Sequence, residues 1–371
     1  MSFWSGRRVL VTGHTGFKGS WLSLWLTQLG AEVCGISLPP STDPNLFTDV
    51  RVDSGLRSEI ADIRDLERIC TIAEQHRPEV VFHLAAQPLV RASYEDPVQT
   101  YTTNVIGTVN VLESVRHSDS VRAVVVVTTD KCYENREWVW SYRETDALGG
   151  HDPYSNSKAC AELVVASYRN SFFPPARYPM HRTAIASARA GNVIGGGDWS
   201  KDRLIPDIIR AFSRRELLRI RNPQAIRPWQ HVLEPLWGYL RLAQRLLEGG
   251  VAFGEAWNFA PDASDARPVE WIVRHLAREF GEGAQWEVDG QQHPHEANML
   301  KLDWSKAAHG LQWHPTLALE DALRLTADWY RRRERGEDPR SVTLEQIEAF
   351  TRLLPDASAR VELQPSTSAT R

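Results

Sequence analysis

The sequence predicts an α/β fold built on a doubly wound parallel sheet, with a smaller, mixed α/β lobe toward the C-terminus. Two observations lead to this prediction. Short apolar, β-branched segments alternate with segments whose apolar residues recur at helical spacing through the first half of the chain. The strand-like segments are continuously apolar, which is typical of strands buried on both faces of a parallel sheet. Right-handed crossovers then place helices on both faces of that sheet.

The expected elements follow one another without long gaps. Strands are expected at residues 7–13, 31–37, 58–62, 79–86, 121–129 and 182–195. Helices are expected at residues 19–30, 66–78, 96–118 and 152–172. Gly30 is placed to cap the first helix, because glycine adopts the left-handed conformation that often ends a helix. Pro78 ends the second helix, since proline cannot continue the hydrogen-bond ladder.

The regular alternation stops after Gly195. Loops rich in Gly, Trp and Arg then separate shorter helices, which are expected at residues 204–216, 233–249 and 317–334. We therefore expect residues 1–190 to form the main domain, with a return segment near 227–248. Residues 191–355 are expected to form mainly the second lobe, over the carboxyl edge of the sheet. The polar tail, 356–371, is expected to be disordered.

Composition excludes several classes of function. The formal net charge of −4 creates no basic field, so nucleic acid is not expected as a partner. The four cysteines lack C-x-x-C spacing and the histidines lack H-x-x-x-H spacing, so neither a disulfide framework nor a metal site is expected. No apolar run approaches the roughly 18 residues that a membrane span needs. We therefore expect a cytoplasmic protein without a membrane segment or secretory signal.

A glycine-rich turn, VTGHTGFKGSW, follows the first expected strand and opens the first expected helix. Gly13, Gly16 and Gly19 allow a tight turn and let backbone N–H groups approach a pyrophosphate at the helix N-terminus. A glycine triplet alone is a weak signal, and a turn without a ligand is the alternative. Its position between a strand and a helix is the context that a dinucleotide site requires. Residues 1–190 are therefore expected to form a Rossmann-like, dinucleotide-binding domain.

The stretch YSNSK places Tyr154 and Lys158 one helical turn apart, on the same face. The pKa of a tyrosine side chain in model peptides is about 10. A nearby ammonium and a cationic nicotinamide favour the phenolate, which can then remove a hydroxyl proton. Two solvated side chains are the alternative, since this spacing is common by chance. The glycine turn and Thr129, at the end of the preceding expected strand, make catalysis the better interpretation.

The G-x-x-G-x-x-G spacing, together with ADIRD, HLAAQ and YSNSK, resembles the extended short-chain dehydrogenase/reductase superfamily. The resemblance implies NAD as the cofactor and a catalytic trio of Thr129, Tyr154 and Lys158. It implies cofactor contacts from Gly13, Thr15, Gly16, Phe17, Gly19, Asp62, Ile63, Ala85, Ala86, Gln87, Asn104, Tyr154 and Lys158. One departure leaves NADP open: Ser37 stands at the end of the second strand, where an acid normally binds the adenosine ribose.

Asp130 and Lys131 directly follow Thr129, and neither simple oxidation nor epimerisation needs them. Nucleotide-sugar 4,6-dehydratases do need a second acid–base pair, and most carry Thr-Asp-Glu at this place. The Thr-Asp-Lys triplet, with the stretch up to YSNSKACAEL, resembles the CDP-glucose 4,6-dehydratase group. The resemblance implies that Asp130 protonates the departing O6 and that Lys131 removes the C5 proton. Lys131 must then be neutral and Asp130 protonated; an ordinary ion pair between them is the alternative.

The same resemblance implies CDP-glucose as the substrate. It implies substrate contacts from Thr129, Asn192, Val193, Arg203, Arg219 and Arg227. Arg227 is the preferred ligand of the diphosphate, because guanidinium groups bind phosphates bidentately. Helices at about 97–117 and 155–173 are expected to pair across a two-fold axis into a four-helix bundle, as in the superfamily. A homodimer or a dimer of dimers is therefore expected.

Two other interpretations remain. Within the superfamily, the chain could be another nucleotide-sugar 4,6-dehydratase, including one of the GDP-mannose type, or a 4-epimerase. Outside enzymes, it could be a non-catalytic protein that binds a cofactor on the same scaffold. Such a protein would be expected to lack part of the set Thr129, Tyr154 and Lys158, and this chain has all three.

Overall fold

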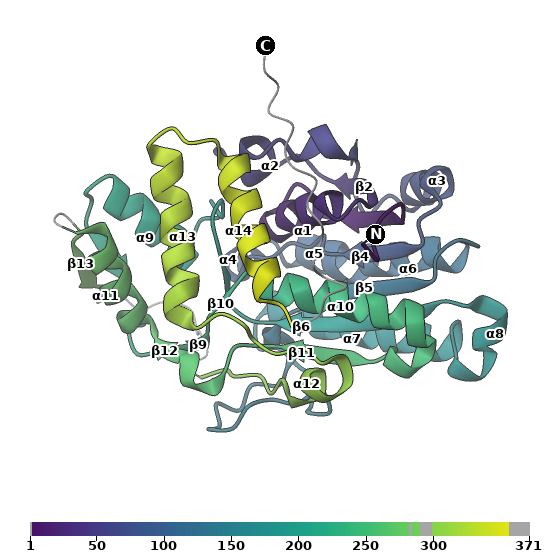
Figure 1. Cartoon of the computed structure of the whole chain (residues 1–371). Helices are drawn as coiled ribbons and strands as arrows, with labels where there is room; N and C mark the ends of the chain where they lie inside the picture. Colours follow the sequence, from purple (N-terminus) through teal and green to yellow (C-terminus); the bar gives the residue numbers. More distant parts are fainter. Residues whose placement is uncertain (1, 282–283, 290–298, 356–371) are drawn as a thin grey trace, which may run out of the picture.

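A seven-stranded parallel sheet forms the centre of the computed structural model, which describes residues 2–281, 284–289 and 299–355 (Figure 1). The strand order is β11-β6-β5-β4-β1-β2-β3, and every neighbouring pair is parallel. The strands are β1 (Arg8–Thr12), β2 (Glu32–Ser37), β3 (Arg57–Ile60), β4 (Val80–His83), β5 (Ala123–Val127), β6 (Ala184–Ala190) and β11 (Ala256–Phe259). The predicted doubly wound α/β fold is confirmed.

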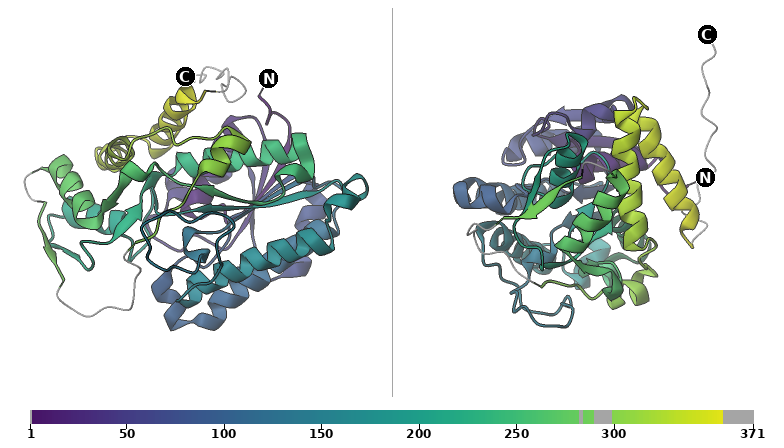
Figure 2. Two further views of the ribbon diagram at one scale, coloured as in Figure 1. Left: turned by 90° about the horizontal axis from the view of Figure 1, so that it is seen from below. Right: turned by 90° about the vertical axis from the view of Figure 1, so that its left-hand side faces the viewer.

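Helices cover both faces of this sheet. The face that carries Val9 and Val11 packs against α1 (Phe17–Gln28) and α10 (Leu233–Gly249), and α14 (Pro339–Leu353) lies over α1. The opposite face, which carries Leu10, packs against α3 (Leu66–His76), α6 (Gly107–Arg116) and α7 (Pro153–Ser171). The left view of Figure 2 shows the sheet between α7 and α10. Alternate residues of each strand therefore enter two separate cores, as continuous apolar strands require.

Two expected elements are divided. The helix expected at 96–118 consists of α5 (Pro97–Tyr101), a π-helical turn (Thr102–Ile106) and α6. The strand expected at 182–195 ends at Ala190 and is followed by the short β7 (Val193–Ile194). In both cases a polar residue, Asn104 or Asn192, lies at the break, where side-chain or loop interactions replace the regular ladder.

The remaining helices and strands are short or lie mostly toward the C-terminus. They are α2 (Leu46–Asp49), α4 (Val90–Glu95), α8 (Tyr178–His181), α9 (Leu204–Ser213), α11 (Val269–Phe280), α12 (Ser305–Leu311), α13 (Leu319–Glu334), β8 (Leu218–Ile220), β9 (Ile226–Pro228), β10 (Gln230–His231), β12 (Ala266–Pro268) and β13 (Trp286–Val288). Three two-stranded pairs, β10–β7, β12–β9 and β13–β8, join parts of this region. Short 3-10 turns lie at Val52–Gly55, Asp130–Cys132, Pro175–Arg177, Gly250–Phe253 and Ala263–Asp265.

The C-terminal half contributes both to the sheet layer and to the group of helices beside it. Helices α9, α11 and α13 pack together beside the sheet, whereas α10 and β11 join the sheet layer itself (Figure 1). Strand β11 was not expected from the sequence. The division into lobes near residue 190 remains a prediction, and the expected disorder of 356–371 lies outside the described residues. In the part of the chain that the structure describes, no helix has the length and apolarity to cross a membrane.

Candidate active site

The glycine turn brings the start of α1 very close to the backbone of two strands. Gly13 has a φ of +79°, and a Cβ there would lie 2.8 Å from the backbone nitrogen of Ala85. A Cβ on Gly19 would collide with the carbonyl oxygen of Gly13. Gly16 caps α1 without a side-chain hydrogen bond, and the first turn contains no acidic residue. The turn therefore leaves the backbone N–H groups at the start of α1 without a side-chain cap, and its chemistry fits a pyrophosphate.

Two polar groups lie beside this turn, at the ends of β2 and β3. The Thr15 hydroxyl donates to the carbonyl of Leu38 and lies 2.8 Å from the Ser37 hydroxyl. Ser37, which replaces the expected acid, is thus held by the glycine turn itself. Asp62 accepts hydrogen bonds from the backbone and side chain of Arg64, which hold the pKa of its carboxyl below the usual value. Ile63 is buried beside Gly107, where a Cβ would clash with its side chain.

Asn104 connects the segment after β4 to the helix that carries Tyr154. Its side-chain oxygen accepts from the backbone nitrogen of Gln87 (2.8 Å), and its amide donates to the carbonyl of Gln87 and to the Ser157 hydroxyl. The predicted cofactor residues Ala85, Ala86 and Gln87 are therefore fixed relative to α7. The side chain of Gln87 also donates to the Thr100 hydroxyl, which fixes Gln87 relative to α5.

A cavity of about 640 Å³ opens beyond the carboxyl ends of β5 and β6. It is lined by nine residues that the sequence predicted for catalysis or substrate binding: Thr129, Asp130, Lys131, Tyr154, Asn192, Val193, Arg203, Arg219 and Arg227. Phe17, from the glycine turn, also lines it. Four of the five predicted catalytic residues and all the predicted substrate residues therefore meet in one space, although they come from segments far apart in the sequence. Lys158, the fifth catalytic residue, does not line the cavity.

Tyr154 and Lys158 are both buried on α7. The Lys158 ammonium donates to the carbonyl of Val127 (3.2 Å), at the end of β5. Burial lowers the pKa of Lys158 to about 8, although the charge of Glu162 opposes this shift. Burial also raises the pKa of Tyr154 to about 12, although a hydrogen bond with Thr129 lowers it. The expected lowering of the Tyr154 pKa is therefore not found in the protein alone, because burial outweighs its neighbours.

The Thr129–Lys131 segment forms a tight turn at the end of β5. The Thr129 hydroxyl donates to Oδ1 of Asp130 (2.9 Å) and accepts from the backbone nitrogen of Lys131 (3.3 Å). Asp130 is 1% exposed, and its Oδ2 has no hydrogen-bond partner among the described residues. Lys131 has a 31% exposed side chain, with Nζ 3.9 Å from Oδ1 of Asp130. The two groups thus lie at ion-pair distance, so the position of the proton between them decides their role.

Three residues that the sequence did not assign to the site lie in or beside the cavity. Lys18 reaches it from the first turn of α1, with Nζ 3.5 Å from the Tyr239 hydroxyl. Burial lowers the pKa of Lys18 to about 7, and the charges of Arg203 and Lys158 add to that effect. Asp198 forms an ion pair with Arg203 (2.9 Å). The position of Lys18 next to the glycine turn could have indicated that it lies in the site. Tyr239 belongs to a largely apolar helix, and nothing in the sequence around it indicated a role in the site.

The predicted substrate arginines differ in their surroundings. Arg227 is 9% exposed and donates to the carbonyl of Ile226. Arg219 has a 67% exposed side chain and pairs with Glu287 at 2.8 Å, at the rim of the cavity. Asn192 lies between β6 and β7, next to the pairing of β7 with β10, and its carbonyl accepts from the backbone nitrogen of Gln230. Within the described residues, no group of His, Cys, Asp and Glu side chains is arranged to hold a metal ion.

Comparison with known proteins gives the family. The family model described as GDP-mannose 4,6 dehydratase matches residues 10–326. The chain belongs to that family. A curated relative, the CDP-glucose 4,6-dehydratase of Salmonella typhimurium (strain LT2), is 57% identical over 337 residues, which are 91% of this chain and 94% of the relative. The prediction that this chain is a nucleotide-sugar 4,6-dehydratase, and so an enzyme, is confirmed by this similarity.

Solved structures of related enzymes share the fold of this dehydratase. UDP-glucuronic acid 4-epimerase from Bacillus cereus, in complex with UDP-glucuronic acid and NAD, has a TM-score of 0.75 and 22% identity, covering 87% of this chain and 99% of its own. dTDP-glucose 4,6-dehydratase from Bacillus anthracis, in complex with NAD, has a TM-score of 0.73 and 21% identity, covering 90% and 99%. These similarities confirm the predicted Rossmann-like fold.

Proposed function

We propose that this dehydratase converts CDP-D-glucose into CDP-4-dehydro-6-deoxy-D-glucose and water, with NAD as a cofactor that ends each turnover in its starting form. The observation that carries the proposal is the 57% identity, over nearly the whole chain, to a CDP-glucose 4,6-dehydratase. The Thr-Asp-Lys triplet in the cavity supports it, since this triplet supplies both an acid and a base beside the Thr129 hydroxyl.

The cradle between Gly13 and Gly19 fits the cofactor pyrophosphate, because no side chain caps the start of α1 and the turn is so tight that a Cβ at either glycine would collide with backbone atoms. Asp62 and Ile63 would hold the adenine, and the Ala85–Gln87 segment would run along the rest of the cofactor. Bound NAD supplies a hydride acceptor at C4 of the sugar and a hydride donor at C6. Ser37 lies beside the cradle without positive charge of its own, which supports NAD over NADP.

Three side chains act on the C4 hydroxyl. Thr129 holds O4, and the Tyr154 phenolate removes its proton as C4 is oxidised. A charged Lys158, one turn along α7 from Tyr154, favours the phenolate, whereas burial of Tyr154 disfavours it. The ketone formed at C4 acidifies the proton on C5.

Asp130 and Lys131 then carry out the elimination. The Lys131 amine removes the C5 proton, and the Asp130 carboxyl gives its proton to the departing C6 hydroxyl, so one water leaves between C5 and C6. This step needs the shared proton on Asp130 at the moment of reaction rather than on Lys131. The buried Oδ2 of Asp130, without a partner among the described residues, is the atom that meets O6. Lys131 later returns a proton to C5.

The arginines lining the same cavity would bind the substrate diphosphate. Arg227, which is nearly buried, remains the preferred ligand, with Arg203 and Arg219 as further cations and Asn192 and Val193 at the strand end. A cavity of about 640 Å³ is in the range of sites that take sizeable small molecules.

Incubation of the purified protein with NAD and, in separate reactions, CDP-glucose, dTDP-glucose, UDP-glucose and GDP-mannose tests the proposal. We expect a 4-keto-6-deoxy sugar, detected by its absorbance in strong base, from CDP-glucose and no accumulation of NADH. A 4-epimerised sugar, or turnover with GDP-mannose but not with CDP-glucose, would contradict it.

We also propose a homodimer, or a dimer of dimers, through α5, α6 and α7. Four large apolar side chains of this region are exposed in the single chain: Val98, Ile106, Leu163 and Phe172. Exposed apolar groups that gather on neighbouring helices favour burial against a second copy.

We also propose that residues 1–190, together with α10 and β11, form the cofactor domain and that the rest of the chain forms the substrate lobe.

A further inference from the structure

We propose that Glu162 is a positioning residue of this reaction: its buried carboxylate fixes the strand end that carries Thr129 and supplies the anion facing the Lys158 ammonium. The inference rests on the proposed function, in which Thr129 and Lys158 act on the sugar. Glu162 itself does not line the cavity, so it acts through these two residues.

The spacing along α7 places Glu162 on the catalytic face of the helix. Tyr154, Lys158 and Glu162 follow one another at intervals of four residues, one turn each. Glu162 is 4% exposed, which makes an unpaired carboxylate at this place very costly. A charged residue in such a position is retained only if several donors surround it.

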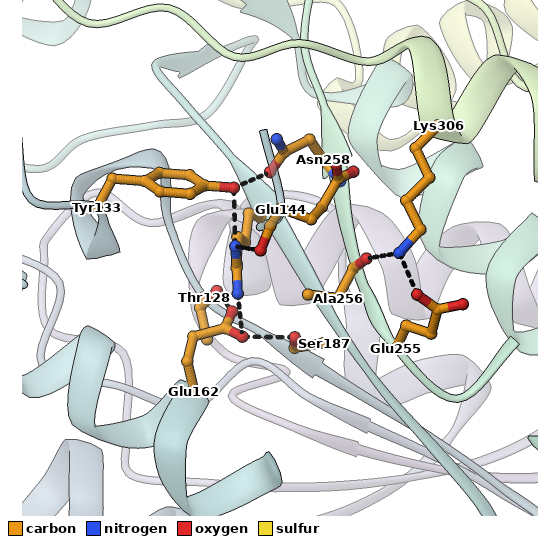
Figure 3. A network of polar contacts seen from close by, with 10 residues as sticks. Thr128, Tyr133, Glu144, Glu162, Ser187, Glu255, Ala256, Asn258 and Lys306 are labelled. Atoms are coloured by element: carbon orange, nitrogen blue, oxygen red, sulfur yellow. Dashed lines mark hydrogen bonds and ion pairs between the residues drawn. The ribbon is translucent and has the colours of Figure 1, made fainter. Parts of the chain in front are cut away.

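Three donors from two neighbouring strands surround the Glu162 carboxylate (Figure 3). Oε1 accepts from the Thr128 hydroxyl at 2.5 Å, directly after β5. Oε2 accepts from the Ser187 hydroxyl at 2.6 Å and from Nη2 of Arg189 at 2.9 Å, both on β6. Glu162 thus joins the catalytic helix to the two strands whose ends form the cavity.

The same network fixes the catalytic turn at its other end. Arg189 donates through Nη1 to the Tyr133 hydroxyl (2.8 Å), which in turn donates to the side chain of Asn258 on β11 (2.8 Å). Thr128 lies directly before the Thr129–Cys132 turn and is bonded to Glu162. Tyr133 lies directly after the turn and is linked to Glu162 through Arg189. The contacts of Tyr133 and Asn258 are visible in Figure 3. Loss of the carboxylate would remove the acceptor of Thr128 and that of Arg189, the residue that links Tyr133 to Glu162.

The charge of Glu162 is the second part of its role. Burial alone would raise the pKa of the Glu162 carboxyl, but Arg189 and the two hydroxyl donors outweigh it and keep the group ionised. Across α7 this anion raises the pKa of Lys158, against the larger effect of burial. Without it, the pKa of Lys158 would fall below about 8, and less ammonium would stand beside Tyr154 near neutral pH.

The other titratable groups around this pair do not replace Glu162. Burial keeps the Cys132 thiol neutral by raising its pKa, and it keeps His83 neutral by lowering its pKa to about 3. Lys18 and Lys158 are like charges that disfavour each other, whereas Arg189 is paired with Glu162 itself. Tyr154 becomes an anion only during the reaction. The described residues thus place one permanent anion, Glu162, against Lys158.

The variant Glu162→Gln keeps the shape of the side chain and removes its charge. We expect the alkaline limb of the kcat profile with CDP-glucose to move down by about one pH unit. The kcat at pH 8 should fall about fivefold, since the charged fraction of Lys158 at that pH would drop from about one half to about one tenth. KM for CDP-glucose should change less than about twofold, since Glu162 does not touch the substrate. Glu162→Asp, which keeps the anion, should move the limb back toward its wild-type position.

A direct titration separates this inference from the proposed function. In protein labelled with ¹⁵N-lysine, with the Lys158 signal assigned from Lys158→Met, the titration midpoint needs no substrate. We expect a lower midpoint in Glu162→Gln than in the wild type. An unchanged midpoint would overturn the inference, whereas failure of the wild type to dehydrate CDP-glucose would overturn the proposed function only.

A second variant covers the case in which Glu162→Gln does not fold, as judged by circular dichroism. Thr128→Val removes one donor to the carboxylate and leaves its charge. We expect a kcat about tenfold lower at every pH, with an unchanged Lys158 midpoint, because the Thr129 turn loses its anchor. Ser187→Ala, which leaves the turn anchored, is the matched control and should stay within about threefold of wild type. Wild-type kcat in Thr128→Val would contradict the positioning role.

Discussion

Burial governs the chemistry of single residues in the cavity. It lowers the pKa of Lys158 to about 8 and raises that of Tyr154 to about 12, so each group is shifted toward its neutral form. Asp130 is almost completely buried, whereas Lys131 is partly exposed at 3.9 Å from it. With the proton on Lys131, Asp130 and Lys131 form an ion pair. With the proton on Asp130, they are an acid and a base.

Lys131→Ala separates the two half-reactions. Because the oxidation depends on Thr129, Tyr154 and Lys158, the variant should still form the C4 ketone with reduced cofactor. It should lose solvent-deuterium exchange at C5, and overall dehydration should fall at least about a hundredfold. Lys201→Ala, an exposed lysine outside the cavity, is the control and should behave as wild type. Full dehydration by Lys131→Ala would refute the assignment of Lys131 as the base.

The residues of the site were predictable where several of them fall in one short stretch. Thr129, Asp130 and Lys131 follow one strand, and Tyr154 and Lys158 share a helix turn, so spacing alone places them. Lys18 and Tyr239 meet only because α1 and α10 cover the same face of the sheet. A contact of that kind depends on tertiary packing, which local periodicity does not contain.

At the scale of elements, the close approach of α1 to the glycine turn is the feature on which the proposed cofactor site depends. A Cβ at Gly19 would collide with the Gly13 carbonyl, so Gly19→Ala should displace the start of the helix. We expect NAD affinity, measured by isothermal titration calorimetry, to fall at least about tenfold, since the amide cradle no longer converges. Gly149→Ala, whose Cβ would meet its nearest atom at an ordinary 3.5 Å, is the control. Equal affinity in both variants would contradict the predicted site.

Helix α10 carries a buried acid that makes the stability of the protein depend on pH. Glu234 accepts from the backbone nitrogens of Thr316 (2.9 Å) and Leu317 (2.6 Å), and burial raises its pKa to about 7. A carboxyl whose pKa is raised on folding lowers stability as pH rises from about 4.5, the value in the unfolded chain, through about 7. Glu234→Gln keeps the acceptor and removes this penalty.

We therefore expect Glu234→Gln to raise Tm at pH 8 by a few degrees and to leave Tm at pH 5 nearly unchanged. Differential scanning fluorimetry at both pH values measures the difference. The exposed acid of the same helix, Glu248, provides the control: Glu248→Gln should alter Tm equally little at both. A lower Tm for Glu234→Gln at pH 8 would contradict the account.

Elements with a long periodic signal were predicted well, and short ones were not. Strands β1, β2, β4, β5 and β6 and the helices around them follow from apolar runs and helical spacing, whereas β3, with the sequence RSEI, has no such run. Strand β11 (Ala256–Phe259) lies beyond the regular alternation of strands and helices in the first half of the chain, and it gains its place by pairing with β6. The π-helical turn at Thr102–Ile106 lies inside an otherwise regular helical pattern, so local sequence did not reveal it.

At the scale of the whole molecule, α5, α6 and α7 lie together on one face of the sheet and expose apolar side chains. We expect native mass spectrometry to give a mass of two or four chains. A variant with Ile106→Glu and Leu163→Glu should shift the distribution toward the monomer, because two charges would have to be buried at the interface. The variant Val139→Glu, exposed but outside these helices, should not. A strictly monomeric wild type would contradict the predicted bundle.

The central claim is that one cavity moves a hydride from C4 to C6 of the same sugar. CDP-glucose carrying deuterium at C4, incubated with the protein and unlabelled NAD, tests this most directly. The account predicts that NMR and mass spectrometry will find the deuterium in the C6 methyl group of a 4-keto product. Deuterium retained at C4, or collected in reduced cofactor that accumulates with turnover, would contradict it.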